Sequence, residues 1–242
     1  MGKVPEVTLA FWLIKICATT LGETGGDAVS MTLDLGYLGS TAIFGAAFAI
    51  AVRAQIITKA FNPCLYWFTI VATTTLGTTL ADFTDRSLGI GYAGGSTILL
   101  SLLLASLFAW HRTLGTIAVD SVTTRSAERF YWITLMFSQT LGTALGDWTA
   151  DTAGLGYMGA MVIYGSLLIA AAAAYQWTRV SRTALFWLAF VLTRPLGAVV
   201  GDFLDKPLEN GGLELGRFAA SAALLIAMLG LISLFPQRAA AR

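Results

Sequence analysis

Long apolar stretches alternate with short polar segments along the whole chain, and this alternation predicts membrane-spanning helices. A helix needs about 20 mostly apolar residues to cross a hydrocarbon core of about 30 Å. Stretches of adequate or nearly adequate length occur at residues 8–27, 38–57, 65–82, 91–111, 130–147, 156–177, 185–202 and 217–235. The pattern therefore predicts an all-α integral membrane protein with eight spans in a single transmembrane domain, residues 1–242.

The eight predicted spans contain four copies of one pattern. A tryptophan stands nine residues before a Leu-Gly pair, and an aspartate follows that glycine by five residues. The tryptophans are Trp12, Trp67, Trp132 and Trp187; the glycines are Gly22, Gly77, Gly142 and Gly197; the aspartates are Asp27, Asp82, Asp147 and Asp202. A further glycine comes nine residues after each aspartate, at Gly36, Gly91, Gly156 and Gly211, and a tyrosine follows it in the first three copies. Self-similarity of this kind predicts a repeat architecture.

Each copy holds two predicted spans, so we expect four helical hairpins, at residues 8–60, 63–115, 128–180 and 183–236. An even number of spans makes every copy enter the membrane from the same side, which predicts parallel repeats with pseudo-symmetry about the membrane normal. Most Lys and Arg residues lie at the termini and between hairpins, and few lie near the aspartates. The positive-inside rule then places both termini in the cytoplasm and the motif turns at the periplasm or exterior.

Acidic residues concentrate in the four motif segments, which hold 11 of the 14 in the chain. Each motif aspartate lies about 22 Å beyond its tryptophan on a helix that rises about 1.5 Å per residue. Four carboxylates at one depth around one axis would form an acidic ring like those of cation channels, and charges inside a membrane are candidate functional groups. The remaining acidic candidates form an expected outer vestibule: Glu23, Asp34, Asp85, Asp151 and Asp205.

Further polar residues extend from the aspartates toward the predicted cytoplasmic side, at intervals of four residues. We expect a polar lining made of Thr19, Thr74, Gln139 and Thr143. Two cations, Lys15 and Arg194, lie deep in predicted spans, and we expect both to pair with motif carboxylates because buried charges need partners. Small residues such as Gly22 and Gly26 are explained by close helix packing.

The motif segments contain neither His nor Cys, so their donors are carboxylates, hydroxyls and backbone carbonyls. Such oxygen donors favour hard cations such as magnesium, calcium and manganese. We expect a bound divalent cation at the four motif aspartates and no other cofactor. The net charge of +1, with 12% charged residues, provides no basic patch for a nucleic acid. Membrane lipid and the transported cation are the expected partners, and a homo-oligomer stays open.

Other functions compete with cation transport. Leu145-Gly146-Asp147 and Gly25-Gly26-Asp27 faintly resemble the glycine-aspartate motif of intramembrane aspartyl proteases, in which two carboxylates share a proton. Four copies exceed what a dyad needs, so we do not expect an enzyme. A proton-coupled exporter of a small organic cation would have a similar acidic interior. In a membrane scaffold each aspartate would merely end its helix, although the helix dipole disfavours a negative charge there.

The segments "KICATTLGETGGDAVSMTLDLGY", "ATTTLGTTLADFTDRSLGIGY" and "SQTLGTALGDWTADTAGLGY" resemble a bacterial membrane family defined by a repeat of unknown function, number 347. The likeness covers nearly the whole chain, although the fourth copy, "TRPLGAVVGDFLDKPLENGG", departs from the pattern after Asp205. The resemblance implies a location in the bacterial inner membrane. It also implies a loose association with divalent-metal transport, particularly manganese export.

Overall fold

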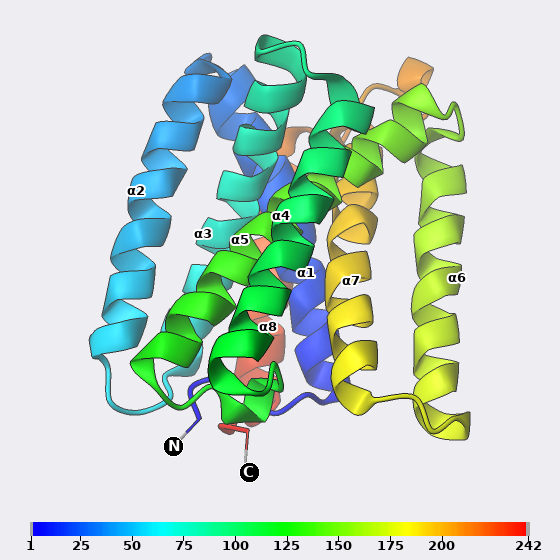
Figure 1. Ribbon diagram of the computed structural model, residues 1–242. Helices are drawn as coiled ribbons and strands as arrows, with labels where there is room; N and C mark the ends of the chain where they lie inside the picture. The colour runs from blue at the N-terminus through cyan, green and yellow to red at the C-terminus, as the bar shows by residue number, and fades with distance from the viewer. Residues whose placement is uncertain (1, 241–242) are drawn as a thin grey trace.

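The computed structural model describes residues 2–240, and the elements in that range are helical apart from one isolated bridge between Pro5 and Ala239. Eight long helices make up the fold (Figure 1): α1 (Leu9–Asp27), α2 (Gly36–Ile57), α3 (Pro63–Asp82), α4 (Gly91–Leu114), α5 (Arg125–Asp147), α6 (Gly156–Trp177), α7 (Arg182–Asp205) and α8 (Arg217–Leu234). The predicted spans agree with these bounds to within five residues at every end. The prediction of an all-helical chain is confirmed for the described residues.

Six of the helices are long and apolar enough to cross a membrane, namely α2, α3, α4, α6, α7 and α8. Burial separates them into two groups. In α3 and α7, 72% and 61% of the most apolar window is buried, whereas in α2, α4, α6 and α8 the share is 17% or less. The other two helices, α1 and α5, bury polar side chains such as Lys15, Glu23 and Gln139. The helices α1, α3, α5 and α7 are therefore the inner ones.

The four inner helices form a closed ring in which α1 contacts α3 and α7, and α5 contacts the same two helices. At each contact the Leu-Gly glycine of one repeat faces the residue three positions before the glycine of the next repeat. A Cβ atom built on Gly22 would lie 2.5 Å from Thr74 Cβ, and one built on Gly77 would lie 2.9 Å from the Gln139 carbonyl carbon. A Cβ atom built on Gly142 would lie 2.5 Å from Arg194 Cβ, and one built on Gly197 would lie 2.6 Å from Thr19 Cβ. The same contact thus recurs four times around one axis.

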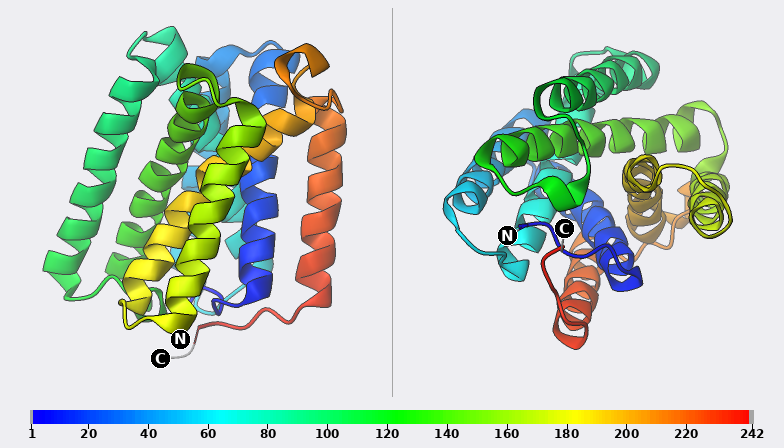
Figure 2. Two further views of the ribbon diagram at one scale, coloured as in Figure 1. Left: turned by 90° about the vertical axis from the view of Figure 1, so that its right-hand side faces the viewer. Right: turned by 60° about the horizontal axis from the view of Figure 1, so that its bottom comes forward.

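The outer helices pack on the neighbouring repeat. Helix α2 packs on α3, α4 on α5, α6 on α7, and α8 returns to α1 and closes the circle (Figures 1 and 2). The two helices of one predicted hairpin hardly contact each other, so each hairpin packs on its neighbours in the ring and not on itself. An apolar outer helix can bury its face against whichever inner helix its connection reaches, and here that helix belongs to the next repeat.

Local sequence explains where each helix begins. The inner helices start at a polar side chain that accepts a backbone N–H three residues on, as N-cap residues commonly do: Thr8, Asn62, Thr124 and Ser181. The outer helices instead start at glycines with positive φ, where a side chain would be strained: Gly36, Gly91, Gly156 and Gly216. Two residues earlier the backbone is also left-handed, at Asp34, Gly89, Gly154 and Glu214.

This common turn corrects the register of the fourth repeat. Gly216 directly precedes α8 and corresponds to Gly36 at the start of α2, so the expected equivalent, Gly211, is wrong. Gly211 instead ends a short helical turn, η5 (Leu208–Asn210). Residues inserted after α7 happened to place another glycine at the predicted spacing. Arg217, which follows Gly216, therefore occupies the position of the tyrosines of the other copies.

Aromatic and terminal residues close the end of the bundle opposite the motif aspartates, here called the terminal end because both chain termini lie there (Figure 2). The inner helices contribute one layer of buried rings: Phe11, Tyr66, Tyr131 and Phe186. Within it the hydroxyl groups of Tyr66 and Tyr131 are 2.6 Å apart. Outside it, Lys3 forms a 2.8 Å ion pair with Glu128. The connection between α4 and α5, with its helical turn η3 (Val119–Ser121), runs across this end, where the Ile117 carbonyl accepts the Trp187 indole N–H.

Candidate functional site

The motif aspartates lie at the opposite end, here called the motif end, where the inner helices stop. After Asp27, Asp82 and Asp147 the chain continues into a single π-helical turn: η1 (Ala28–Thr32), η2 (Phe83–Ser87) and η4 (Trp148–Thr152). Such wide turns are rare and frequently occur at functional sites. In the fourth repeat α7 stays α-helical to Asp205. Three repeats thus share a special backbone directly after the aspartate, and the fourth differs.

Two basic side chains connect the four aspartates in pairs. Arg86 lies 3.0 Å from Asp82 through Nε and 3.2 Å from Asp147 through Nη2. Lys206 lies 2.7 Å from Asp27 and 3.1 Å from Asp202. All four aspartates are buried, with 2 to 6% of each residue exposed. The structure therefore brings the predicted ring together, and it adds two cations that bridge the ring.

Lys206 lies just beyond the end of α7. Its burial lowers the pKa of the ammonium group, but the carboxylates of Asp202 and Asp27 outweigh that effect and raise the pKa above its ordinary range. Lys206 therefore stays positively charged between these two aspartates at physiological pH.

A second ion pair lies one helical turn deeper, toward the terminal end. Arg194 Nη1 donates to Glu23 Oε2 at 2.9 Å, and both side chains are almost fully buried. Arg194 Nη2 donates to the hydroxyl groups of Thr78, at 2.6 Å, and of Thr143. Glu23, Thr78 and Thr143 each follow the Leu-Gly glycine of their repeat, so they form one layer. The structure confirms the expected carboxylate partner of Arg194.

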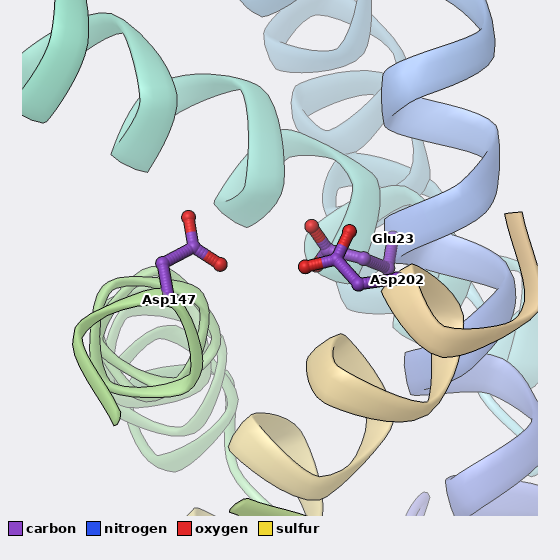
Figure 3. Close-up of side chains that lie close together, drawn as sticks. All are labelled: Glu23, Asp147 and Asp202. Carbon is purple, nitrogen blue, oxygen red and sulfur yellow. The ribbon is translucent and has the colours of Figure 1, made fainter. Parts of the chain in front are cut away.

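Three carboxylates from three inner helices converge in this region (Figure 3). Glu23 of α1, Asp147 of α5 and Asp202 of α7 each offer an oxygen, and these oxygens all lie within 4.8 Å of one another. Asp147 Oδ1 is buried and has no hydrogen-bond partner within the described chain. A second group, Asp27, Asp202 and Asp205, meets the same distance limit and is also contacted by basic side chains, but it comes from only two inner helices, α1 and α7. Glu23, Asp147 and Asp202 therefore form the candidate cation site.

Charge counting supports a cation at this position. The cluster holds five carboxylates, Glu23 and the four motif aspartates, and the cations that contact them at 3.2 Å or less are Arg86, Arg194 and Lys206. When all five carboxylates are ionised, two negative charges remain uncompensated. Buried charge without a counter-charge is strongly unfavourable, so the cluster favours either protonation of a carboxylate or the binding of additional positive charge. One divalent cation would balance it.

An open cavity of about 400 Å³ lies beside the cluster at the motif end. Its lining comprises Arg86, Ala150, Asp151, Gly156, Tyr157, Lys206 and Asn210. Arg86 and Lys206 thus face this cavity on one side and the buried aspartates on the other. The predicted vestibule residue Asp151 lies at the cavity, as the sequence pattern suggested.

Other predicted vestibule residues lie elsewhere. Asp34 is exposed in the turn before α2, with φ of 55°, and it takes the position of Gly89 and Gly154. The side chain of Asp85 turns toward α4, where its Oδ1 atom fills the space beside Gly95. Asp205 pairs with Arg217 at 3.0 Å and borders the cluster through Asp27 and Asp202. Among these three, only Asp205 belongs to the cluster region.

The structure also revises the predicted polar lining. The hydroxyl groups of Thr19 and Thr74 lie 2.9 and 2.8 Å from backbone carbonyls of their own helix and 3.2 and 3.3 Å from carbonyls of the neighbouring inner helix, so they belong to helix contacts. The amide of Gln139 is buried without a hydrogen-bond partner in the described chain. Of the four residues, only Thr143 contacts the ion pair through its side chain, and the Thr74 carbonyl accepts from Arg194 Nη2 at 3.4 Å. The predicted lining is thus mainly an interface between repeats.

The expectation that Lys15 pairs with a carboxylate is wrong. Its ammonium group lies 3.0 Å from the Thr193 hydroxyl, 3.5 Å from the Phe190 carbonyl and 3.8 Å from the centre of the Phe190 ring. The corresponding residues in the other repeats, seven positions before the Leu-Gly glycine, are Ile70, Leu135 and Phe190. Lys15 therefore lies in an otherwise apolar layer, more than two helical turns from Asp27.

Sequence reasoning missed the roles of Thr78, Arg86 and Lys206. Arg86 and Lys206 each follow a motif aspartate by four residues, a spacing that places two helical side chains on one face. The corresponding residues in the first and third repeats are Met31 and Asp151. Thr78 aligns with Glu23 and Thr143 at the same position of the repeat. Comparison of the four copies position by position would have found all three residues.

Comparisons with known proteins identify the repeat. The model of the repeat of unknown function DUF347 matches residues 10–61, 65–122, 130–181 and 185–236. These ranges agree with the predicted copies to within a few residues, apart from a longer second copy. No protein in the curated set and no solved structure matches the chain. Since the four matches cover most of the sequence, the chain belongs to the DUF347 repeat family.

Proposed function

We propose that the protein is a membrane transporter or channel that moves a divalent metal cation through the carboxylate cluster at the motif end. The observation that carries this proposal is the convergence of Glu23, Asp147 and Asp202, with oxygens within 4.8 Å of one another. Carboxylate oxygens at this spacing suit a hard cation, because magnesium, calcium and manganese prefer oxygen ligands. The two uncompensated negative charges of the cluster match the charge of one such ion.

The setting of the cluster supports transport. Six helices have the length and composition of membrane spans, and the five cluster carboxylates are buried residues of the four inner helices. Ionisable groups in such positions commonly mark ion pathways. The cavity beside Arg86 and Lys206 gives access from the motif end. Toward the terminal end, the Arg194 layer and the aromatic layer fill the interior, so passage requires these layers to open.

The finer features of the proposal rest on the sequence. Eight spans with both termini in the cytoplasm follow from the repeats and from the distribution of Lys and Arg. Placement in the bacterial inner membrane, manganese as the ion, and export as the direction follow from the family resemblance. The membrane potential or a proton gradient would drive the movement, since the chain contains no P-loop motif for a nucleotide.

A metal-content assay tests this proposal. The wild type, Asp147→Asn and Asp34→Asn would be expressed at equal abundance in a metal-sensitive bacterial host. Total cellular manganese, magnesium, calcium, zinc and nickel would then be measured after metal challenge. Asp34→Asn is the matched control, because it removes a motif carboxylate that lies outside the cluster, and asparagine tolerates left-handed backbone.

We expect the wild type and Asp34→Asn to change the cellular content of one divalent metal, and Asp147→Asn to lose this effect. Unchanged metal contents with the wild type would reject metal transport. An active Asp147→Asn variant would reject the cluster as the transport site. Cleavage of a co-expressed membrane substrate would instead favour the enzyme alternative.

A further inference from the structure

Arg86 and Lys206 have a feature that metal transport alone does not explain. Each cation occupies a position where an entering ion would bind. Arg86 contacts Asp147, Lys206 contacts Asp202 and Arg194 contacts Glu23, so all three candidate ligands already hold a positively charged side chain. Of these three cations, Arg86 and Lys206 line the cavity at the motif end. An ion that binds among Glu23, Asp147 and Asp202 must therefore compete with both side chains for carboxylate oxygens.

The access route reinforces this competition. Arg86 and Lys206 line the cavity at the motif end, and 35% and 15% of their side chains are exposed. The carboxylates behind them are nearly inaccessible, with 3% of the Asp147 side chain and 9% of the Asp202 side chain exposed. An ion that arrives through the cavity meets the two cations before it meets the ligands.

The two cations are confined to two of the four repeats. At the corresponding position, four residues after the motif aspartate, the first repeat has Met31 and the third has Asp151. The contacts between inner helices recur in all four repeats, whether the residue at this position is basic or not. The cations occur only in the second and fourth repeats, and each connects its own aspartate to the aspartate of a neighbouring repeat.

We propose that Arg86 and Lys206 determine charge selectivity: they act as tethered monovalent cations that a divalent ion displaces and a free monovalent ion does not. This inference rests on the proposed cation site. Electrostatic attraction grows with the charge of the ion, so a divalent cation gains about twice as much as a monovalent one at the same distance. A tethered side chain also loses little freedom when it binds, whereas a free ion must be captured from solution. Sodium or potassium therefore gains nothing by replacing Lys206.

The experiment uses the full chain, purified in detergent, and equilibrium dialysis against radioactive manganese. The dialysis buffer would contain choline chloride as the reference salt, because choline is too large for the space between the carboxylates. Potassium chloride would then replace the choline chloride at constant ionic strength. The variants are Arg86→Met and Lys206→Met, which introduce the residue that the first repeat has at this position. Lys59→Met, which removes an exposed lysine elsewhere, is the matched control. Lys206→Arg keeps the charge and should retain wild-type selectivity.

We expect potassium to have little effect on manganese binding by the wild type and Lys59→Met. In Arg86→Met and Lys206→Met we expect potassium to compete with manganese at least about tenfold more strongly. Each variant lacks one of the two tethered positive charges that keep potassium away from the carboxylates. Equal potassium sensitivity in all proteins would overturn the proposal. So would a charge-preserving Lys206→Arg that behaves like Lys206→Met.

Failure of the transport proposal gives a separate result. If the wild type binds no manganese, dialysis against radioactive sodium replaces the competition assay. Sodium binding by Lys206→Met, absent in the wild type, would support the selectivity role, whereas no sodium binding by any variant would overturn it. If the protein binds manganese selectively in dialysis but does not change the cellular metal content, the transport proposal would be rejected and the selectivity proposal would stand.

Discussion

Replacing Arg194 by glutamine should destabilise the protein strongly, because it removes one partner of a fully buried ion pair. The change is conservative for the repeat, since Gln139 occupies the same position in the third copy. The substitution removes the 2.9 Å contact of Arg194 with Glu23 and the hydrogen bonds that Arg194 donates to Thr78 and Thr143. Glu23 then keeps only the two threonine hydroxyls, at 3.2 and 3.5 Å.

The magnitude follows from the burial of both partners. Removing one member of a buried pair leaves an uncompensated charge and typically costs about 3–5 kcal/mol. Arg194 is 0% exposed and Glu23 3%, so solvent does not reduce this cost appreciably. Glu23→Thr, which copies the residue of the second and third repeats, should cost a similar amount. The double variant should lose much less than the sum, with a coupling energy of about 2–3 kcal/mol.

Unfolding in mixed detergent micelles, followed by the fluorescence of the seven tryptophans, measures these free energies. The wild type, both single variants and the double variant form a complete thermodynamic cycle. Additive losses in the double variant would refute the reasoning, because they would mean that Arg194 and Glu23 do not interact. Losses below about 1 kcal/mol in both single variants would also refute it, since that range is typical of exposed ion pairs.

The remaining predictions concern helix packing and the isolated lysine. Gly142→Ala should destabilise the protein by about 1–3 kcal/mol through overpacking against Arg194, whereas Gly25→Ala, which meets open space, should be neutral or stabilising. Equal effects of these two substitutions in the same unfolding assay would argue against the close contact between repeats. Lys15→Met should leave stability unchanged or raise it, because Thr193 still donates to the Phe190 carbonyl at 2.8 Å and no carboxylate loses a partner. A loss of several kcal/mol in thermal unfolding would contradict this expectation.

The sequence predicted the helices and their common symmetry well, because both depend on patterns that recur locally. Apolar stretches of membrane-spanning length fix the positions of the helices, and the repeated Leu-Gly and aspartate spacing places equivalent residues at one level. The ring formed by Asp27, Asp82, Asp147 and Asp202 follows directly from that repetition. These inferences required no knowledge of which helices are neighbours.

The errors arose where neighbours matter. The apolar length of α2 predicts a membrane span, but it does not reveal that the helix packs on α3. Lys15 was expected to find a carboxylate because a buried charge needs a partner, yet the fold turns its ammonium group to Thr193. Gly211 matched the expected spacing by coincidence, and only the left-handed turn at Gly216 reveals the insertion. Asp34 shared the motif with the cluster residues but serves the turn before α2.

The partners of the aspartates show the same limit. Arg86 and Lys206 are among the few basic residues that lie near the motif aspartates in the sequence. Each lies four residues from its own aspartate, and this contact was accessible from helix geometry. Their second contacts, from Arg86 to Asp147 and from Lys206 to Asp27, cross between repeats and depend on the order of helices around the ring.

Anomalous X-ray diffraction from crystals of the full chain grown with manganese would test the cation site most directly. We predict one strong manganese peak among the carboxylates of Glu23, Asp147 and Asp202, and its loss in Asp147→Asn crystals grown under the same conditions. A manganese peak elsewhere, or wild-type crystals without bound manganese at saturating concentration, would contradict the account.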